Sequence, residues 1–185
     1  LENICNHIHL PLQAGSDRIL KRMNRTYSQK EFLNLAEKIR LYLPDCAIST
    51  DIIVGFPGET EEDFLQTLNV IRQVGFDSAF MFKYSSRPGT KAAEYTDQIP
   101  EDIKQSRLER LIELQKNVSL IANQKQIGNI LQVIVEKESK KSTRQWAGRT
   151  EGNCWVVFDK GNEQINDIIN IKITDDDKDY ELFQN

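Results

Sequence analysis

Apolar and polar residues alternate along residues 1–99 in blocks that have the lengths of strands and helices. Three apolar runs, at residues 8–13, 47–56 and 78–85, are predicted to be strands. Amphipathic segments lie between these runs and are predicted to be helices. Strands that alternate with helices indicate parallel βαβ units. Because three strands cannot close a barrel, we expect these units to form half of one.

Local signals mark the ends of the predicted helices. Ser16, Ser28 and Thr60 each precede an amphipathic segment and are predicted N-caps, and Ser28 forms a capping box with Glu31. Gly75 suits the C-terminal end of the third helix. The side chains predicted to face the core are Ile19, Leu20 and Met23 in the first helix, Phe32, Leu35, Ala36, Ile39 and Leu43 in the second, and Phe64, Leu68 and Ile71 in the third.

A long helix and a set of short strands follow. The helical pattern runs from Glu101 to about Gln126. Short strands are then predicted at residues 130–135, 145–147, 154–158 and 168–173. Strands this short and this closely spaced are typical of a small all-β barrel. We therefore expect an α/β domain at residues 1–126 and an all-β domain at residues 127–185, where the acidic run 175–177 is a solvated turn.

The composition of the chain and its first residues indicate the cellular compartment that we expect. No apolar run is long enough to cross a bilayer, and the first residues lack the features of a signal peptide. The chain does not start with Met, so we expect it to be cut from a longer protein. Its three cysteines, Cys5, Cys46 and Cys154, are odd in number and widely spaced, which argues against disulfides and for the reducing cytoplasm. No pair of them has metal-ligand spacing, so no metal site is predicted.

A lone carboxylate, Asp51, stands inside the second apolar run, shortly before the turn Gly55-Phe56-Pro57-Gly58. An unpaired buried charge is costly, so Asp51 needs a partner. One candidate is a polar ligand at the carboxyl end of the strand, where α/β proteins place their sites. The alternative is an internal ion pair with Arg25. As a bare strand-to-helix turn, residues 55–58 need no ligand. His7 and His9 share a strand face, where packing is commoner than metal binding because no third ligand is near.

Basic residues gather in one segment of the predicted all-β domain. Residues 137–149 contain five cations and one acid, Glu138, so the local charge is +4 in a chain whose net charge is −4. Attraction to nucleic acid must therefore come from this segment. Basic side chains beside an aromatic on a small β-barrel suit RNA contact, although a solvated hairpin gives the same pattern. The residues concerned are Lys137, Lys140, Lys141, Arg144, Trp146 and Arg149.

These features together resemble one family, the radical-SAM tRNA methylthiotransferases. The matching stretches are residues 9–16, 20–25, 49–60, 79–90 and 148–153. They span nearly the whole chain, whereas Gly55-x-x-Gly58 alone is a weak motif. The resemblance implies a partial, TIM-like radical-SAM barrel followed by a TRAM domain, a small RNA-binding barrel.

The resemblance also implies which residues bind S-adenosylmethionine (SAM). Gln13, Arg25 and Asp51 match positions that hold polar parts of the cofactor, and Arg suits its carboxylate because it donates two hydrogen bonds. Gly55, Phe56, Pro57 and Gly58 match the turn beneath the adenine. Arg87, after the third strand, is expected to meet an RNA phosphate, although an exposed arginine in a Pro-Gly loop needs no ligand.

The activity implied is transfer of a methylthio group to isopentenylated adenosine next to the anticodon of tRNA. The parent enzyme would use SAM and two 4Fe-4S clusters. The N-terminal domain and three-cysteine cluster motif of the family are missing, so we expect this fragment to bind no cluster and to be inactive alone. Its expected partners are the tRNA anticodon stem-loop and the missing domains, and not a membrane. Close relatives act on threonylcarbamoyladenosine instead, and a noncatalytic RNA-binding protein is a further alternative.

Overall fold

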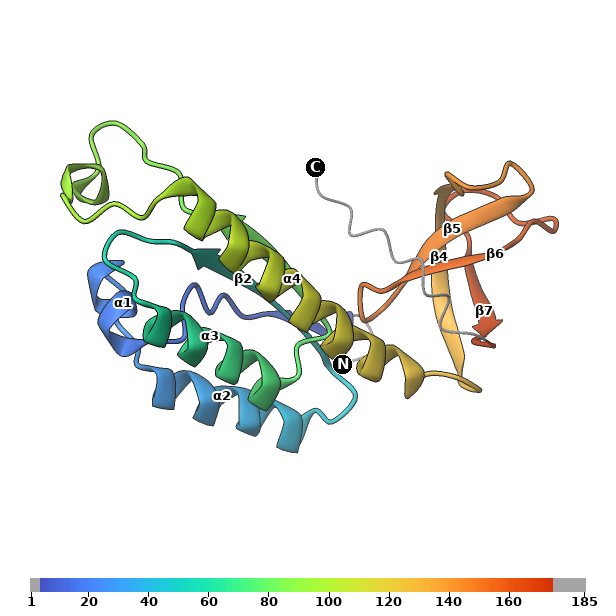
Figure 1. Ribbon diagram of the computed structural model, residues 1–185. Coiled ribbons are helices and arrows are strands. Elements are labelled where there is room, and N and C mark those ends of the chain that lie inside the picture. Colours follow the sequence, from blue (N-terminus) through green and yellow to red (C-terminus); the bar gives the residue numbers. More distant parts are fainter. Residues whose placement is uncertain (1–3, 175–185) are drawn as a thin grey trace. The chain divides into compact units, whose positions relative to one another are not determined.

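The computed structural model describes residues 4–174, which divide into two compact units (Figure 1). Residues 8–119 form the first unit, and residues 120–174 together with residues 4–7 form the second. In the described part of the chain, no helix is long and apolar enough to cross a membrane. The acidic run 175–177 lies outside the described residues.

The first unit is built on a three-stranded sheet in the order β1-β2-β3, with β1 at His7–His9, β2 at Ala47–Val54 and β3 at Ser78–Lys83. Strands β2 and β3 are parallel and Asp51 lies opposite Phe80, which confirms the predicted βαβ unit. The helices are α1 (Asp17–Arg22), α2 (Gln29–Tyr42), α3 (Glu61–Val74) and α4 (Glu101–Gln124), with a 3-10 helix at Lys91–Glu94.

The predicted helix ends are largely confirmed. Ser28 and Thr60 head capping boxes, and Gly75 ends α3 in the left-handed conformation. Ser16 occupies the N-cap position of α1 but does not cap it, because its hydroxyl donates to Asp63 Oδ1 at 2.6 Å. The sequence reveals the position of this serine but not its distant partner.

The first strand is shorter than predicted. Only His7–His9 belong to β1, and the chain rejoins the sheet through a single bridge between Gln13 and Ile52. Pro11 has no N–H to give to a ladder, and Gln13 has a φ of 64°, in the left-handed region. The chain therefore bends away between the two points of pairing.

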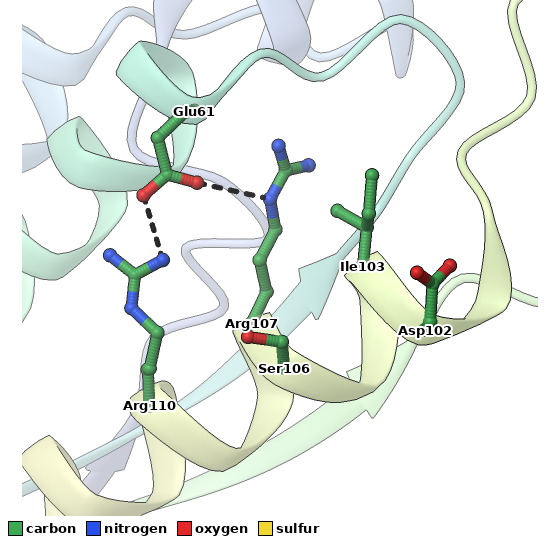
Figure 2. Close-up of a pocket in the computed structure, with 6 residues that line it drawn as sticks. All are labelled: Glu61, Asp102, Ile103, Ser106, Arg107 and Arg110. Atoms are coloured by element: carbon green, nitrogen blue, oxygen red, sulfur yellow. Dashed lines mark hydrogen bonds and ion pairs between the residues drawn. The ribbon is translucent and has the colours of Figure 1, made fainter.

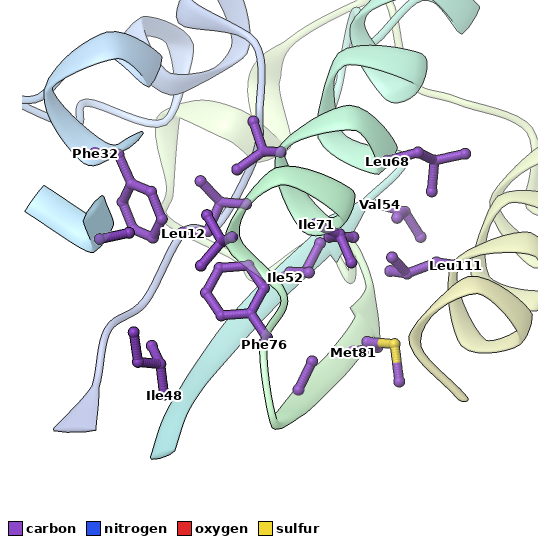
Figure 3. Packing of buried hydrophobic residues seen from close by; sticks show 14 of the residues in the cluster. Leu12, Phe32, Ile48, Ile52, Val54, Leu68, Ile71, Phe76, Met81 and Leu111 are labelled. Atoms are coloured by element: carbon purple, nitrogen blue, oxygen red, sulfur yellow. The ribbon is translucent and has the colours of Figure 1, made fainter. Parts of the chain in front are cut away.

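One face of the sheet packs against the helices (Figure 3). Along β2, Ile48, Ile52 and Val54 are almost fully buried against residues of α2, α3 and α4. Two residues predicted to face this core do not, since Leu35 and Leu43 of the α2 segment are 46% and 47% exposed. The core side of α2 is thus narrower than its apolar stripe and centres on Phe32 and Ala36.

The other face of the sheet carries polar and aromatic side chains. Successive residues of a strand point to opposite faces, so Asp51 and Ile53 lie opposite the core. Their partners on β3 are Phe80 and Phe82, which are 49% and 52% exposed. Polar Asp51 therefore stands on a partly exposed face and not in the hydrophobic core.

The second unit is a four-stranded antiparallel sheet in the order β6-β5-β4-β7. Its strands are β4 (Ile130–Glu138), β5 (Gln145–Thr150), β6 (Trp155–Asp159) and β7 (Ile168–Lys172), which confirms the predicted strand positions. Val133 and Val135 are fully buried. The β4–β5 pairing shifts register between Val135 and Lys137, so one extra residue bulges there.

Gly148 is required where β5 pairs closely with β4. A Cβ at this position would lie 2.3 Å from the Ile134 carbonyl oxygen and 2.6 Å from Val133 Cγ1. We expect Gly148→Ala to destabilise the second unit by about 1–3 kcal/mol, the usual cost of overpacking. Both tryptophans of the chain, Trp146 and Trp155, belong to this sheet, so urea unfolding followed by their fluorescence reports on it.

The matched control is Val157→Thr, on the neighbouring strand β6. Val157 is 51% exposed, so this change should alter stability by less than about 0.5 kcal/mol. An unfolding midpoint for Gly148→Ala equal to that of the control would contradict the close approach of β4 and β5.

Candidate functional site

The turn between β2 and α3 is held by segments that are distant in sequence. Gly55 and Gly58 have φ values of 72° and 78°, which favour glycine. Gly58 N donates to the carbonyl oxygen of Asp97 at 2.8 Å, and Arg18 Nη2 donates to the Gly58 carbonyl at 2.6 Å. The turn backbone is therefore bonded to α1 on one side and to the segment before α4 on the other.

A buried ion pair lies under this turn. The side chains of Glu59 and Arg107 are 2% and 6% exposed, and Arg107 Nη1 lies 2.8 Å from Glu59 Oε1. Gly55 N donates to the same carboxylate, 3.1 Å from Oε1 and 3.2 Å from Oε2. Burial raises the pKa of Glu59 to about 7, although the bonds from Gly55 and Arg107 favour the ionised form.

Sequence reasoning missed this pair, although one signal was available. Arg107 and Gln115 flank Leu111 at a spacing of four residues, and all three are buried on α4. A charged residue at the spacing of a buried stripe needs a buried partner. Which carboxylate supplies it depends on how α4 packs, and the sequence does not give that.

Asp63 ties α1 to the start of α3. Its carboxylate accepts hydrogen bonds from Ser16, from Arg18 and from the backbone and hydroxyl of Thr60. Burial opposes ionisation of Asp63, but the bonds from Arg18, Ser16 and Thr60 outweigh it and hold its pKa well below the ordinary value. Arg18 bonds both Asp63 and the Gly58 carbonyl, so α1 is fixed against the turn.

The structure links the three predicted cofactor residues through Gln13. Gln13 N donates to the Asp51 carbonyl oxygen at 2.8 Å, and Arg25 Nη2 donates to Gln13 Oε1 at 3.1 Å. The carboxylate of Asp51 pairs with His9 Nε2 at 3.3 Å, and His9 Nδ1 lies 2.9 Å from Ser49 Oγ. The alternative of an Arg25–Asp51 ion pair is therefore wrong, because each side chain has a different partner.

The chemistry of these side chains fits a ligand that carries a carboxylate, an amine and hydroxyl groups. Arg25 is exposed and cationic, and the Asp51 side chain is 31% exposed. The turn itself is packed: Phe56 is 7% exposed and contacts Tyr84 and Tyr95 edge-on, with ring centroids 5.1 and 6.4 Å apart. The cofactor roles of Gly55, Phe56, Pro57 and Gly58 stay predictions.

A polar surface hollow of about 450 Å³ lies between the start of α3 and the first turns of α4 (Figure 2). Glu61 Oε1 is 2.7 Å from Arg110 Nη1, and Glu61 Oε2 is 3.6 Å from Arg107 Nε. None of the predicted cofactor residues lines this hollow; its lining comprises Glu61, Asp102, Ile103, Ser106, Arg107 and Arg110. We therefore do not assign the cofactor to it.

The predicted RNA-binding residues fall into two groups. Lys140, Lys141 and Arg144 are exposed in the turn between β4 and β5. Arg149 and Trp146 are half-buried: Arg149 Nε lies 2.6 Å from Glu136 Oε1, and the ring of Trp146 lies 4.2 Å from Lys160 Nζ. The exposed group is the one placed to meet a large polyanion.

Three aromatic–cation contacts of this sheet were not expected. The Trp155 ring lies 4.3 Å from Lys137 Nζ and 5.2 Å from the Arg149 guanidinium carbon. Lys160, the residue directly after β6, lies over the Trp146 ring. Arg87 is exposed in the loop after β3, and its role stays a prediction. Within residues 4–174 there is no group of three or more His, Cys, Asp and Glu side chains suited to a metal ion.

Comparison with known families defines the class. The Radical SAM superfamily matches residues 1–71, and the TRAM domain matches residues 124–180. A solved radical SAM enzyme, coproporphyrinogen III oxidase from Escherichia coli, superposes with a TM-score of 0.53 at 14% identity over 79% of this chain and 41% of its own. The chain is thus a radical SAM protein that carries a TRAM domain.

Individual relatives narrow the family further. The tRNA-2-methylthio-N(6)-dimethylallyladenosine synthase of Carboxydothermus hydrogenoformans is 51% identical over 93% of this chain, and that of Syntrophomonas wolfei is 50% identical over 98%. The chain belongs to the family of these synthases. It spans 39% and 41% of the length of these two relatives.

Proposed function

We propose that this chain is the C-terminal part of an enzyme that transfers a methylthio group to C2 of N6-isopentenyladenosine next to the anticodon of tRNA. The observation that carries the proposal is the identity of about 50% with synthases named for this product, over more than nine-tenths of the chain. The complete enzyme is proposed to work in the cytoplasm with SAM and two 4Fe-4S clusters.

The part of this chain in the reaction is to bind and orient. When bound, SAM supplies the radical chemistry, and the protein supplies position and shielding. Arg25 would hold the carboxylate of SAM, while Gln13 and Asp51 would hold amino or hydroxyl groups. The hydrogen bonds that join Gln13 to both Arg25 and Asp51 support this assignment.

The activity is tested in a bacterium that lacks its own methylthiotransferases. Expression of the full-length protein should yield 2-methylthio-N6-isopentenyladenosine in digested tRNA, detected by mass spectrometry against an empty-vector control. Methylthiolation of threonylcarbamoyladenosine alone would move the proposal to that substrate. tRNA without any methylthio nucleoside, from cells that contain the folded protein, would contradict it.

The cofactor site is tested by Arg25→Ala in the full-length protein. We expect this change to weaken SAM binding by about 1.5–3 kcal/mol, because hydrogen bonds to charged groups contribute this much. Titration calorimetry measures it. Arg72→Ala, which removes an exposed arginine near the end of α3, is the matched control and should leave affinity unchanged. Equal SAM affinity in both variants would refute the assignment.

The second unit is proposed to bind the anticodon stem-loop through the basic turn. Lys140, Lys141 and Arg144 are exposed together there, while the chain as a whole has a net charge of −4. Attraction to phosphate is therefore local. Arg149 and Trp146 are proposed contacts too, and within the protein they contact Glu136 and Lys160 respectively. Arg87 is proposed as a further contact in the first unit.

Changing Lys140, Lys141 and Arg144 together to Ala should weaken tRNA binding and flatten its salt dependence. Each lost phosphate contact lowers the slope of log K against log salt by roughly 0.7–0.9, so the triple variant should lose about two units or more. Fluorescence titrations at several salt concentrations measure this slope.

The control removes three exposed lysines from α2 and α4, namely Lys30, Lys38 and Lys116. It changes the net charge equally, so it should leave the slope close to that of the wild type. If the two triple variants behaved alike, the basic turn would be an ordinary solvated hairpin.

A further inference from the structure

The residue that ends the turn also binds its beginning. The carboxylate of Glu59 accepts a hydrogen bond from Gly55 N, so residues 55–59 form a closed loop. Arg107 Nη1 contacts this carboxylate at 2.8 Å and the Glu59 carbonyl oxygen at 3.2 Å. One guanidinium therefore fixes the last residue of the loop, and the last residue fixes the first.

An ion pair buried this deeply needs an explanation other than stability. Removing two charges from water costs several kcal/mol each, and well-packed apolar residues often stabilise a core as well or better. What apolar residues do not supply is an acceptor for the buried N–H of Gly55 and a donor for the Glu59 carbonyl. The pair thus determines the backbone shape of the loop.

We propose that Glu59 and Arg107 are positioning residues, and that their ion pair holds the Gly55–Glu59 backbone in the shape that receives SAM. The inference rests on the proposed function, because it assigns the cofactor to this loop. Arg107 belongs to α4 and lies beyond residues 1–71, which match the radical SAM family. Under this proposal, helix α4 contributes to the cofactor site through Arg107, which bonds the last residue of the loop.

Protonation of Glu59 should weaken the Glu59–Arg107 ion pair that holds the loop. The charged groups around Glu59 are Arg107 and Lys104 from α4, Asp63 and Glu61 from α3, and Arg18 from α1. The pKa of Glu59 is raised from 4.5 to about 7, so the folded protein holds its proton between these values. The contribution of Glu59 to the free energy of unfolding is therefore fully present below pH 4.5 and is lost as the pH rises through 7. The ion pair with Arg107 forms over the same pH range.

Folding stability and loop positioning therefore depend on the charge of Glu59 in opposite ways, and this difference distinguishes a positioning role from a merely structural one. Glu59→Gln mimics the neutral side chain, so at pH 8 it should unfold at a higher urea concentration than the wild type, and near pH 5 at a similar one. In the full-length protein, the same variant should bind SAM about tenfold more weakly at pH 8, the effect of losing one hydrogen bond to a charged group. A purely structural residue would not combine greater stability with weaker binding.

The hydrogen bond from Gly55 N to the Glu59 carboxylate can be followed directly by NMR of this chain. The Gly55 amide signal should shift with a midpoint near pH 7, and the shift should be absent in Glu59→Gln. The amide of Gly58, which is bonded to the Asp97 carbonyl, should not follow that midpoint and serves as the internal control. A Gly55 signal unaffected by Glu59→Gln would overturn the proposed role of Glu59 in holding the loop, whatever the SAM affinity of the variant.

Arg107→Lys completes the test. It keeps the positive charge but not the guanidinium that reaches both the carboxylate and the carbonyl oxygen of Glu59. SAM binding should therefore weaken about tenfold. Arg110→Lys, one turn away and paired with Glu61, is the control and should bind normally. Normal SAM affinity in Arg107→Lys and Glu59→Gln, with Arg25→Ala impaired, would overturn the inference and leave the proposed function standing. If the wild type did not bind SAM, both would fall.

Discussion

Backbone groups at the turn from β2 into α3 are bonded by several distant segments, and the need to satisfy them organises the first unit. The partners come from distant parts of the chain: Arg18 from α1, Asp97 from the segment before α4, and Arg107 from α4 itself. Each contact brings a different element against the same few peptide groups. The helices are thus positioned around the turn by hydrogen bonds as well as by the apolar core beneath them.

Local signals in the sequence were sufficient for most of the elements. Capping boxes, apolar periods and strand lengths predicted the helices and strands because these depend on neighbours within a few residues. The errors occurred where tertiary contacts decide. Leu35 and Leu43 continue an apolar stripe beyond the width of the core, and Ser16 exchanges a local cap for a bond to Asp63. Neither outcome depends on neighbouring residues alone.

The sequence predicted which residues form the candidate site better than it predicted which side chains pair with one another. Gln13, Arg25 and Asp51 were expected to act together, and the structure links them, but His9 rather than Arg25 pairs with Asp51. In the second unit, strand register places Glu136 beside Arg149 and Lys160 over Trp146. Register is a property of folded strands, so a count of charges along residues 137–149 does not anticipate it.

The bulge in β4 has a consequence for how the second unit tolerates changes in length. Val135 pairs with Gly148 and Lys137 pairs with Ala147, so Glu136 is the residue without a cross-strand counterpart on β5. Deleting one residue here would not merely shorten the strand. It would restore a regular ladder in which Lys137 still opposes Ala147, and it would remove the local kink and the extra twist that a bulge gives to a strand. Deleting a paired residue of β4 would instead shift the register and turn the side chains beyond it to the opposite face. The strand is therefore expected to tolerate loss of the bulged residue better than loss of a residue that pairs with β5.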